Sequence, residues 1–187
     1  MTVEQLAIRV IGSCEKRSMD HMLTGAFAYN CYGIPRATKD VDIVVDVSAP
    51  GGIKSLIGEL EPEIEFGGQV QFDTLTWGRR HIGNPVGNTL VRIELFELFD
   101  DAFVKTQFSR RKRISVPQLS IESWIPTPED MVVQKLRWGR PKDLDDALDI
   151  LAIMDPDTLD MPYIRNWCAI HKTTARLEAA LAQIPPF

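Results

Sequence analysis

The sequence predicts a mixed α/β fold, with an α/β core over residues 1–126 and a helical C-terminal subdomain over residues 127–187. Two observations carry this prediction. Strand-like and helix-like patterns alternate in the first two thirds of the chain, whereas only helical periodicity follows residue 127. In addition, 187 residues with 44% apolar and 25% charged residues are typical of one globular domain with at most a small appended subdomain.

Two strands are expected at the centre of the core. VDIVVDV at 41–47 predicts the first, and APGG at 49–52 ends it. TLVRIELFELF at 89–99 predicts the second. Alternation along this strand separates an apolar face from a face that carries Arg92 and Glu94.

Other elements of the core are expected around these strands. Apolar residues at helical spacing predict helices over residues 3–18 and from 53 to 60. The stretch MLTGAFAYNCYG predicts a short strand, a turn at Gly25 and a short helix that ends near Gly33. Residues 64–88 are rich in glycine and predict short β-like pieces without a definite register.

Two more short strands are predicted by RISV at 113–116 and by the residues around Trp124. TPED at 127–130 then combines an N-cap threonine, a proline in the first turn and a capping-box acid, which predicts the start of a helix. A second helix is expected to end near Leu151, and a further helical pattern runs over residues 162–184.

RATKDVDIVVD at 36–46 places acidic residues in a stretch that otherwise reads as a buried strand. On a strand, Asp40 and Asp42 project to the same face, with Cα atoms about 6.6 Å apart. Their oxygens can converge on one or two hard cations, and Mg²⁺ is usually held by one or two carboxylates together with substrate phosphates. The pair therefore indicates a metal-dependent reaction at a phosphate group.

Neighbouring residues support this interpretation. Gly25 lies between a strand-like and a helix-like segment, where free backbone N–H groups can hold a triphosphate. Arg36 can bind a phosphate, and the Thr38 hydroxyl can orient a carboxylate or the loop. Glu94 can supply a third carboxylate from the separate strand, as a metal ligand or as a general base for an acceptor hydroxyl.

Each of these features also has a purely structural interpretation. Two acids at the entrance of a strand can simply face water, Gly25 can form a tight turn, and Glu94 can be a solvated strand residue. In the C-terminal third, the charged residues 142–146 can cap the start of a helix. The residues alone leave these alternatives open.

The stretch TGAFAYNCYGIPRATKDVDIVVD resembles the signature of small nucleotidyltransferases of the DNA polymerase β superfamily, and is closest to the minimal and abortive-infection toxin-type branch. The matching pattern G-x-x-R-x-T-x-D-x-D comprises Gly33, Arg36, Thr38, Asp40 and Asp42. The segment TPEDMVVQKLRWGRPKDLDDALDIL also resembles this branch, whose helical part carries a lysine followed by a Lys-Asp pair. The corresponding positions are Lys135, Lys142 and Asp143.

The resemblance implies a mixed central sheet flanked by helices, with a helical C-terminal subdomain that closes over the nucleotide. It implies transfer of a nucleoside monophosphate from an NTP to an acceptor, with release of pyrophosphate and with Mg²⁺ or Mn²⁺ as the metal. Asp40, Asp42 and Glu94 would be both the catalytic residues and the metal ligands.

The resemblance also implies a set of nucleotide-binding residues: Thr24, Gly25, Arg36, Thr38, Lys135, Lys142 and Asp143. Among them, Gly25 would contact phosphates, and Lys135 with Lys142 would neutralise the charge of the triphosphate. Many members carry Gly-Ser at the turn, whereas this chain has Gly25-Ala26. Thr24 is the nearby hydroxyl that would take the place of the serine.

Three functions are compatible with the sequence. The first is a nucleotidyltransferase that modifies tRNA, a protein or a small molecule, with a toxin-like role and a cognate antitoxin-like partner as one form of it. The second is a catalytically silent member that binds a nucleotide or a partner protein, which the missing turn serine favours. The third is an antibiotic nucleotidyltransferase, for which an acidic pocket complementary to a cationic drug is expected.

Charge and cysteine content indicate the cellular setting. The net charge of −5 argues against indiscriminate binding to nucleic acid, and the basic run at 110–113 is either a solvated edge or a surface that docks an acceptor such as RNA. Cys14, Cys31 and Cys168 form no CxxC pair. We expect no secretory signal, because MTVEQLAIRV has no continuous apolar stretch, and no membrane span, because no segment approaches about 18 uninterrupted apolar residues. We therefore expect a reduced, cytoplasmic protein without a membrane partner.

Overall fold

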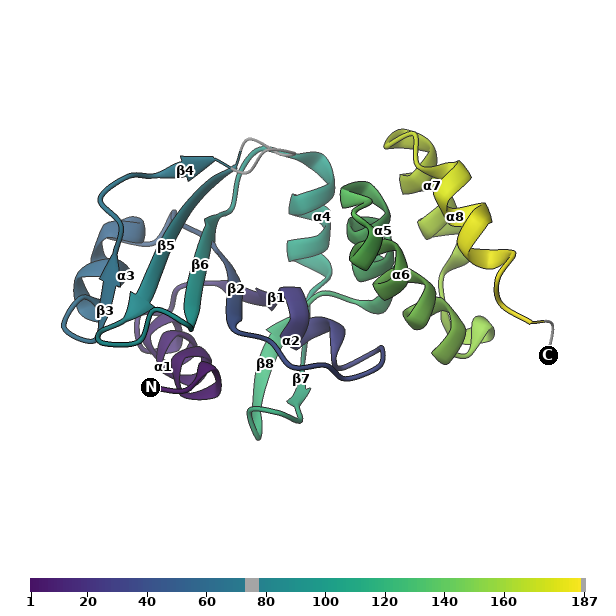
Figure 1. Ribbon diagram of the computed structural model, residues 1–187. Helices are drawn as coiled ribbons and strands as arrows, with labels where there is room; N and C mark the ends of the chain where they lie inside the picture. Colours follow the sequence, from purple (N-terminus) through teal and green to yellow (C-terminus); the bar gives the residue numbers. More distant parts are fainter. Residues whose placement is uncertain (73–77, 186–187) are drawn as a thin grey trace.

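The computed structural model describes residues 1–72 and 78–185 and shows a central mixed sheet followed by a group of helices (Figure 1). The strands of the sheet are β1 (His21–Thr24), β2 (Asp40–Val45), β3 (Ile64–Phe66), β4 (Gln71–Phe72), β5 (Arg79–Pro85) and β6 (Arg92–Glu97). Their order is β1-β2-β6-β5-β3, with β4 also paired to β5. Only the pairing of β2 with β6 is parallel among these described strands.

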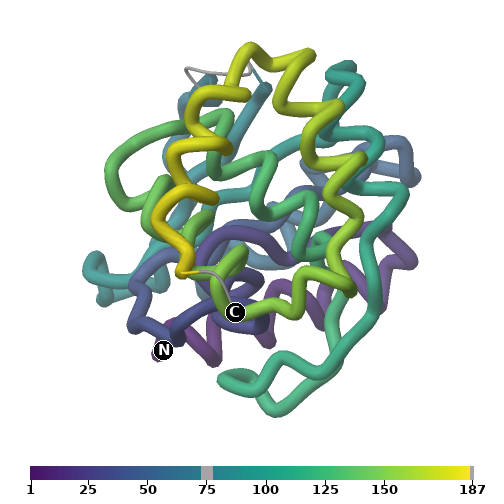
Figure 2. Tube along the Cα trace, turned by 90° about the vertical axis from the view of Figure 1, so that its right-hand side faces the viewer, coloured from purple at the N-terminus to yellow at the C-terminus, as the bar shows by residue number. Residues whose placement is uncertain are grey.

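Helices flank this sheet and make up the C-terminal third. They are α1 (Val3–Lys16), α2 (Gly25–Tyr29), α3 (Gly52–Leu60), α4 (Ala102–Arg110), α5 (Pro128–Trp138), α6 (Pro141–Ile153), α7 (Met161–Ile170) and α8 (Thr174–Leu181), with a short 3₁₀ helix at Pro156–Thr158. A separate hairpin pairs β7 (Lys112–Val116) with β8 (Ile121–Ile125). Figure 2 shows the last two helices, in yellow-green and yellow, in front of the rest of the molecule. None of the described helices is both long and apolar enough to cross a membrane.

One face of the sheet packs into the main hydrophobic core. Val41, Ile43 and Val45 of β2 point to this face, where they are completely buried in the main hydrophobic core with residues of α1 and α3. Burying each such side chain stabilises the fold by roughly 1.5–3 kcal/mol. A shift of one residue would exchange the two faces and bury the acids of β2 instead, so the apolar residues fix the register of this strand.

The opposite face of the sheet is only partly covered. Phe108 of α4 packs there against Met22 and Val44, in a second small hydrophobic cluster. Asp40 and Asp42 precede Val44 on the same face of β2, beyond the part that α4 covers. The fold therefore leaves one end of this face open, and that end carries the acids.

The mixed fold with flanking helices agrees with the sequence prediction, but two helical regions differ from it. α4 was not expected, because its phenylalanines, valine and threonine are weak helix formers over only nine residues. The signal that marks its start is Asp101, whose side chain accepts a hydrogen bond from the Val104 N–H at 3.0 Å. The helical pattern over 162–184 is divided between α7 and α8, since Lys172 adopts a left-handed conformation with φ of 58°.

A buried polar cluster connects α4, α5 and α7. Asp130, in the first turn of α5, is completely buried and accepts hydrogen bonds from Thr127 at 2.9 Å and from the Tyr163 hydroxyl. Arg110 completes the cluster, because its Nε lies 3.3 Å from the Asp130 carboxylate and its guanidinium stacks on the Tyr163 ring at 4.0 Å. The cluster attaches the C-terminal helices to the last turn of α4.

Arg110 belongs to the basic run at 110–113, and other members of this run are also paired within the chain. Arg111 lies 2.8 Å from Asp20, and Arg113 contacts Glu15 and Glu122. The run is therefore only partly a solvated edge. The pairing reduces the positive charge that it presents to a nucleic acid.

We expect Asp130→Asn to lower the free energy of unfolding by about 2–3 kcal/mol, because it removes hydrogen bonds to a buried charged group. Urea denaturation followed by circular dichroism measures this change. Asp145→Asn is the control, because Asp145 is an exposed acid of α6 and its replacement should change stability by less than about 0.5 kcal/mol. Equal stability of the two variants would contradict the structural role of Asp130.

Candidate active site

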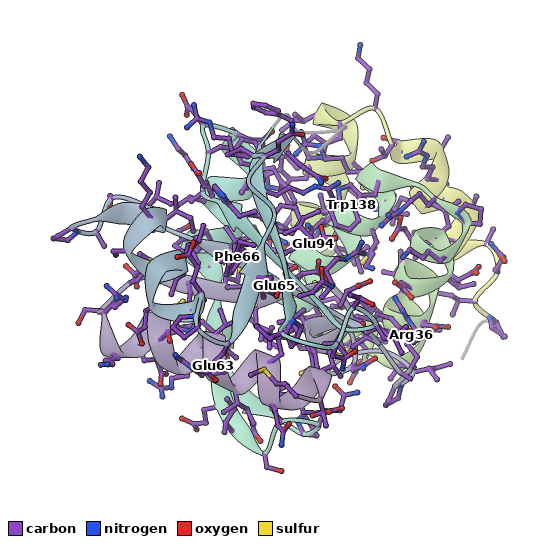
Figure 3. The ribbon with its side chains drawn as sticks, turned by 60° about the vertical axis from the view of Figure 1, so that its left-hand side comes forward. Arg36, Glu63, Glu65, Phe66, Glu94 and Trp138 are labelled. Carbon is purple, nitrogen blue, oxygen red and sulfur yellow. The ribbon has the colours of Figure 1, made fainter. Side chains whose placement is uncertain are left out.

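The pairing of β2 with β6 places the predicted acids next to one another. In this parallel pair, Asp42 lies opposite Glu94 and Asp40 lies opposite Arg92. On the other side of β2, Thr24 of β1 is the register partner of Asp42. Figure 3 labels Glu94 on the sheet, with Trp138 and Arg36 toward the side of the C-terminal helices.

These acids form the floor of a cavity of about 470 Å³ between the sheet and helices α5 and α6. The predicted site residues that line it are Gly25, Arg36, Thr38, Asp40, Asp42, Glu94, Lys135 and Lys142. It is also lined by Ala26, Arg80, Arg92, Phe96, Trp138 and Arg140. The cavity thus brings together both halves of the sequence motif, with six cationic and three acidic side chains in its lining.

Asp42 is an uncompensated acid at the centre of this floor. Its carboxylate accepts no hydrogen bond from any residue that the structure describes. Burial, together with the charges of Glu94 and Asp40, raises the pKa of Asp42 to about 7. A half-buried carboxylate beside two other acids is unfavourable without a cation and is a suitable ligand for one.

Gly25 is required by the position of Asp42. A Cβ atom at residue 25 would lie only 1.9 Å from Oδ2 of Asp42, and the φ angle of Gly25 is +61°. Both constraints exclude a side chain at this turn. The glycine at this turn is thus explained by close approach of the backbone to the acid, in addition to any role in phosphate binding.

Glu94 and Asp40 are engaged by arginines. Arg80 Nη1 lies 3.0 Å from Oε2 of Glu94, and Arg92 Nη2 bridges Glu94 at 3.2 Å and Asp40 at 3.1 Å. Among the described residues, no three acidic, histidine or cysteine side chains are grouped closely enough to hold a metal ion. Asp40 and Asp42 nevertheless fit a hard cation, because they share one face of β2 and Asp42 has no counter-ion in direct contact.

A second charged cluster forms the wall of the cavity at the C-terminal helices. Lys135 Nζ lies 2.6 Å from Asp146 and 3.4 Å from Asp143, and all three residues are buried. Arg36 pairs with Asp146 at 3.0 Å, and Arg140 pairs with Asp143 at 2.5 Å. The two aspartates of α6 therefore fix the positions of three cations that line the cavity.

Two predicted nucleotide-binding residues do not line the cavity. Asp143 is completely buried and does not line the cavity; its carboxylate holds Lys135 and Arg140, which do. Thr24 is also buried, and its hydroxyl has no hydrogen-bond partner among the described residues. Thr24 lines a separate cavity of about 40 Å³ beside Val44 and α4. This position does not support the expectation that the Thr24 hydroxyl takes the place of the turn serine.

Arg80, Arg92, Arg140 and Asp146 are cavity or support residues to which the sequence assigned no role in the site. The alternation of β6 placed Arg92 on the face of Glu94, which was a usable signal. Arg80 could not be found in this way, because the register of residues 64–88 was not defined by the sequence. The sequence indicated Asp146 only as a charge near the start of a helix, whereas in the structure its carboxylate accepts a hydrogen bond from Lys135.

Residues 15–180 match the family described as "Nucleotidyltransferase of unknown function (DUF6036)". The chain belongs to this nucleotidyltransferase family. A comparison with curated proteins gave no match.

Two solved structures share the fold of this nucleotidyltransferase. An antigenic nucleotidyltransferase-like protein from Paracoccidioides brasiliensis aligns at a TM-score of 0.56 and 17% identity, over 100% of this chain and 94% of its own. The antibiotic-resistance factor ANT(2'')-Ia aligns at a TM-score of 0.57 and 9% identity, over 94% of this chain and 95% of its own. At these identities the likeness concerns the fold alone. The family match confirms the nucleotidyltransferase superfamily expected from the sequence motifs.

We expect Gly25→Ala to destabilise this nucleotidyltransferase by at least about 1–2 kcal/mol, since an L-residue is strained in the left-handed conformation even before the contact with Asp42 is counted. Denaturant unfolding measures the change. Gly58→Ala is the matched control, because Gly58 lies in α3 with no atom within 4 Å of its Cβ position, and alanine should stabilise that helix. A similar stability of both variants would show that the turn at residue 25 tolerates a side chain.

We expect Asp42→Asn to raise the melting temperature at pH 8 by several degrees in buffer that contains EDTA. The pKa of Asp42 is raised in the folded protein, so ionisation of this carboxyl destabilises the native state as pH rises from about 4 through 7. Asparagine stays neutral, and its advantage should disappear near pH 4. Melting curves from pH 4 to 8 test this, with Asp145→Asn as control; parallel pH profiles for wild type and Asp42→Asn would refute it.

Proposed function

We propose that this protein catalyses metal-dependent transfer of a nucleoside monophosphate from an NTP to an acceptor hydroxyl, with release of pyrophosphate. The observation that supports this most directly is the register of β2 and β6, which sets Asp40, Asp42 and Glu94 side by side on the cavity floor. The excess of cationic side chains around these three acids suits a polyanionic substrate.

The triphosphate would lie against the cations that come from the loop before β2 and from α5 and α6. Asp146 holds Arg36 and Lys135 in place, and Arg140 and Lys142 line the cavity at the start of α6. Because most of these groups are already fixed by ion pairs, they need little reorganisation when phosphate oxygens replace water. Their role would be to bind and orient the triphosphate.

Asp40 and Asp42 would hold Mg²⁺ or Mn²⁺, for which a pair of neighbouring carboxylates is a suitable donor set. A bound ion would offset the negative charge of the phosphates. Glu94, opposite Asp42, would accept the proton of the acceptor hydroxyl. The hydroxyl oxygen would form a bond to the α-phosphorus of the NTP, and the bond from that phosphorus to pyrophosphate would break.

The charge of the cavity narrows the choice of acceptor. An antibiotic nucleotidyltransferase would need an acidic pocket for a cationic drug, whereas this lining has twice as many cations as acids. RNA, a protein or a small anionic molecule is therefore a better candidate. A toxin-like role with an antitoxin-like partner is a hypothesis that rests on the family resemblance alone. A cytoplasmic location suits the proposal, because all three cysteines are free.

A catalytically silent nucleotide-binding protein is the second candidate function. It is favoured by Ala26, which lines the cavity where many related enzymes carry a serine, and by the burial of the Thr24 hydroxyl outside the cavity. Both functions require the same nucleotide site. They differ only in whether the bound NTP is turned over.

The deciding measurement is a calorimetric titration of the purified protein with each NTP, with and without Mg²⁺. We expect at least one NTP to bind with an affinity that Mg²⁺ raises. In the Asp40→Asn/Asp42→Asn double variant, we expect the gain in affinity on addition of Mg²⁺ to be at least tenfold smaller than in the wild type. The substitutions remove ligand charge and leave the packing of β2 unchanged, so the fold should be retained.

Asp145→Asn should bind the NTP and Mg²⁺ like the wild type, since Asp145 is exposed on α6. Binding of an NTP without release of pyrophosphate after addition of cell extract as a source of acceptors would support the silent protein. No binding of any NTP would refute both functions.

A further inference from the structure

We propose that Arg80 and Arg92 form a phosphate site on the acceptor side of the cavity, so that the acceptor carries a phosphate ester close to the hydroxyl that is modified. This inference rests on the proposed nucleotidyl transfer. It adds the chemical class of the second substrate, which neither the sequence motifs nor the family defines.

The cations of the cavity fall into two groups on different structural elements. The first group, here called the helical bank, comprises Arg36, Lys135, Arg140 and Lys142. The second group, here called the sheet bank, comprises Arg80 on β5 and Arg92 on β6. Both banks act on the Asp42 carboxylate. Burial raises its pKa, whereas the positive charges of Lys135 in the helical bank and Arg92 in the sheet bank each lower it.

Transfer of a nucleotidyl group requires that the attacking and leaving oxygens lie roughly in line through the α-phosphorus. If the helical bank binds the triphosphate and receives the pyrophosphate, the acceptor hydroxyl must approach from the opposite side. The sheet bank lies on other elements of the cavity lining than the helical bank and is the candidate for that side. Both of its arginines contact Glu94, the candidate base for the hydroxyl, which Figure 3 labels on the sheet.

The two arginines have more donor capacity than Glu94 uses. Each guanidinium has five N–H donors. Arg80 directs one nitrogen to Glu94 and another to Gln71, and Arg92 directs one nitrogen to Glu94 and Asp40. The side chains of Arg80 and Arg92 are 28% and 43% exposed and line the cavity, so their remaining N–H groups can reach a ligand there. A phosphate oxygen is a strong acceptor for such groups.

Electrostatics favours the same ligand. Asp40, which would help to hold a cation, is also a partner of Arg92, so the guanidinium of Arg92 shares its anionic partner with the proposed metal site. A cationic acceptor would be repelled by both arginines, and a neutral one would leave them unpaired. A phosphate ester can bind both guanidinium groups and still place a neighbouring hydroxyl at Glu94.

The phosphate ester can come from two sources, a phosphodiester of RNA or a phosphomonoester of a small molecule. The experiment therefore has two arms. The protein is loaded with Mg²⁺ and the α,β-methylene analogue of the NTP that binds it, an analogue that does not transfer its nucleotidyl group. Binding of a fluorescently labelled single-stranded RNA of 12 nucleotides, or of ribose 5-phosphate, is then measured by anisotropy or by calorimetry respectively.

We expect the loaded wild type to bind one of the two probes. Arg80→Gln and Arg92→Gln should each weaken that binding roughly tenfold or more, which is the effect expected for a lost charge-assisted hydrogen bond. In the RNA arm, each substitution should also lower the slope of log K against log salt by about 1. Arg80→Lys should recover part of the affinity, because it restores charge without the planar donor geometry.

Arg79→Gln is the matched control, since Arg79 is the exposed neighbour of Arg80 on β5 and does not line the cavity. It should leave binding of the probe unchanged. The affinity for the nucleotide analogue, measured separately, distinguishes failure of the phosphate site from failure of the proposed function. If the α,β-methylene analogues of ATP, CTP, GTP and UTP all fail to bind the wild type, the proposed function itself is overturned.

If the analogue binds but the loaded wild type binds neither probe, the phosphate site is refuted and nucleotide binding stands. The same conclusion follows if Arg80→Gln and Arg92→Gln bind a probe as well as Arg79→Gln does. In that case the two arginines only position Glu94. Loss of affinity in one arm supports the phosphate site and identifies its source.

Discussion

The parallel pairing of β2 with β6 is the constraint on which the site depends. Three apolar residues of β2 are completely buried on one face of the sheet, and this burial permits a single register. The same register puts Asp42 opposite Glu94 on the other face. The candidate catalytic acids are therefore positioned by hydrophobic residues on the far side of the strand, which do not line the cavity.

Charge balance is the second principle of this structure. The cavity lining is rich in cations, but buried aspartates of α6 already neutralise part of that charge and hold Lys135, Arg36 and Arg140 in place. Two arginines do the same for Glu94 on the sheet. Asp42 is the exception, because it has no direct counter-charge among the described residues and its pKa is raised. The least compensated charge of the site is therefore that of Asp42, the residue that a cation would contact.

The sequence predicted those features that depend on local pattern. The alternation around Asp40 and Asp42, the glycine turn at residue 25 and the N-cap at Thr127 all depend on neighbours within a few positions. It did not predict features that depend on pairing between distant segments. Arg80 reaches Glu94 only because β5 pairs with β6, and Asp146 meets Lys135 only because α6 folds back on α5. α4 was missed because its stability comes from packing rather than from helix propensity.

The ion pair between Arg36 and Asp146 joins residues that are 110 positions apart in the chain. During synthesis at about 5–20 residues per second, the motif that carries Asp40 and Asp42 emerges roughly 5–20 s before its partners on α6. The cavity wall cannot form in that interval, because Lys135, Asp143 and Asp146 have not yet been made. A nascent chain therefore carries the acids without the site, and the site is completed only when most of the polypeptide has left the ribosome.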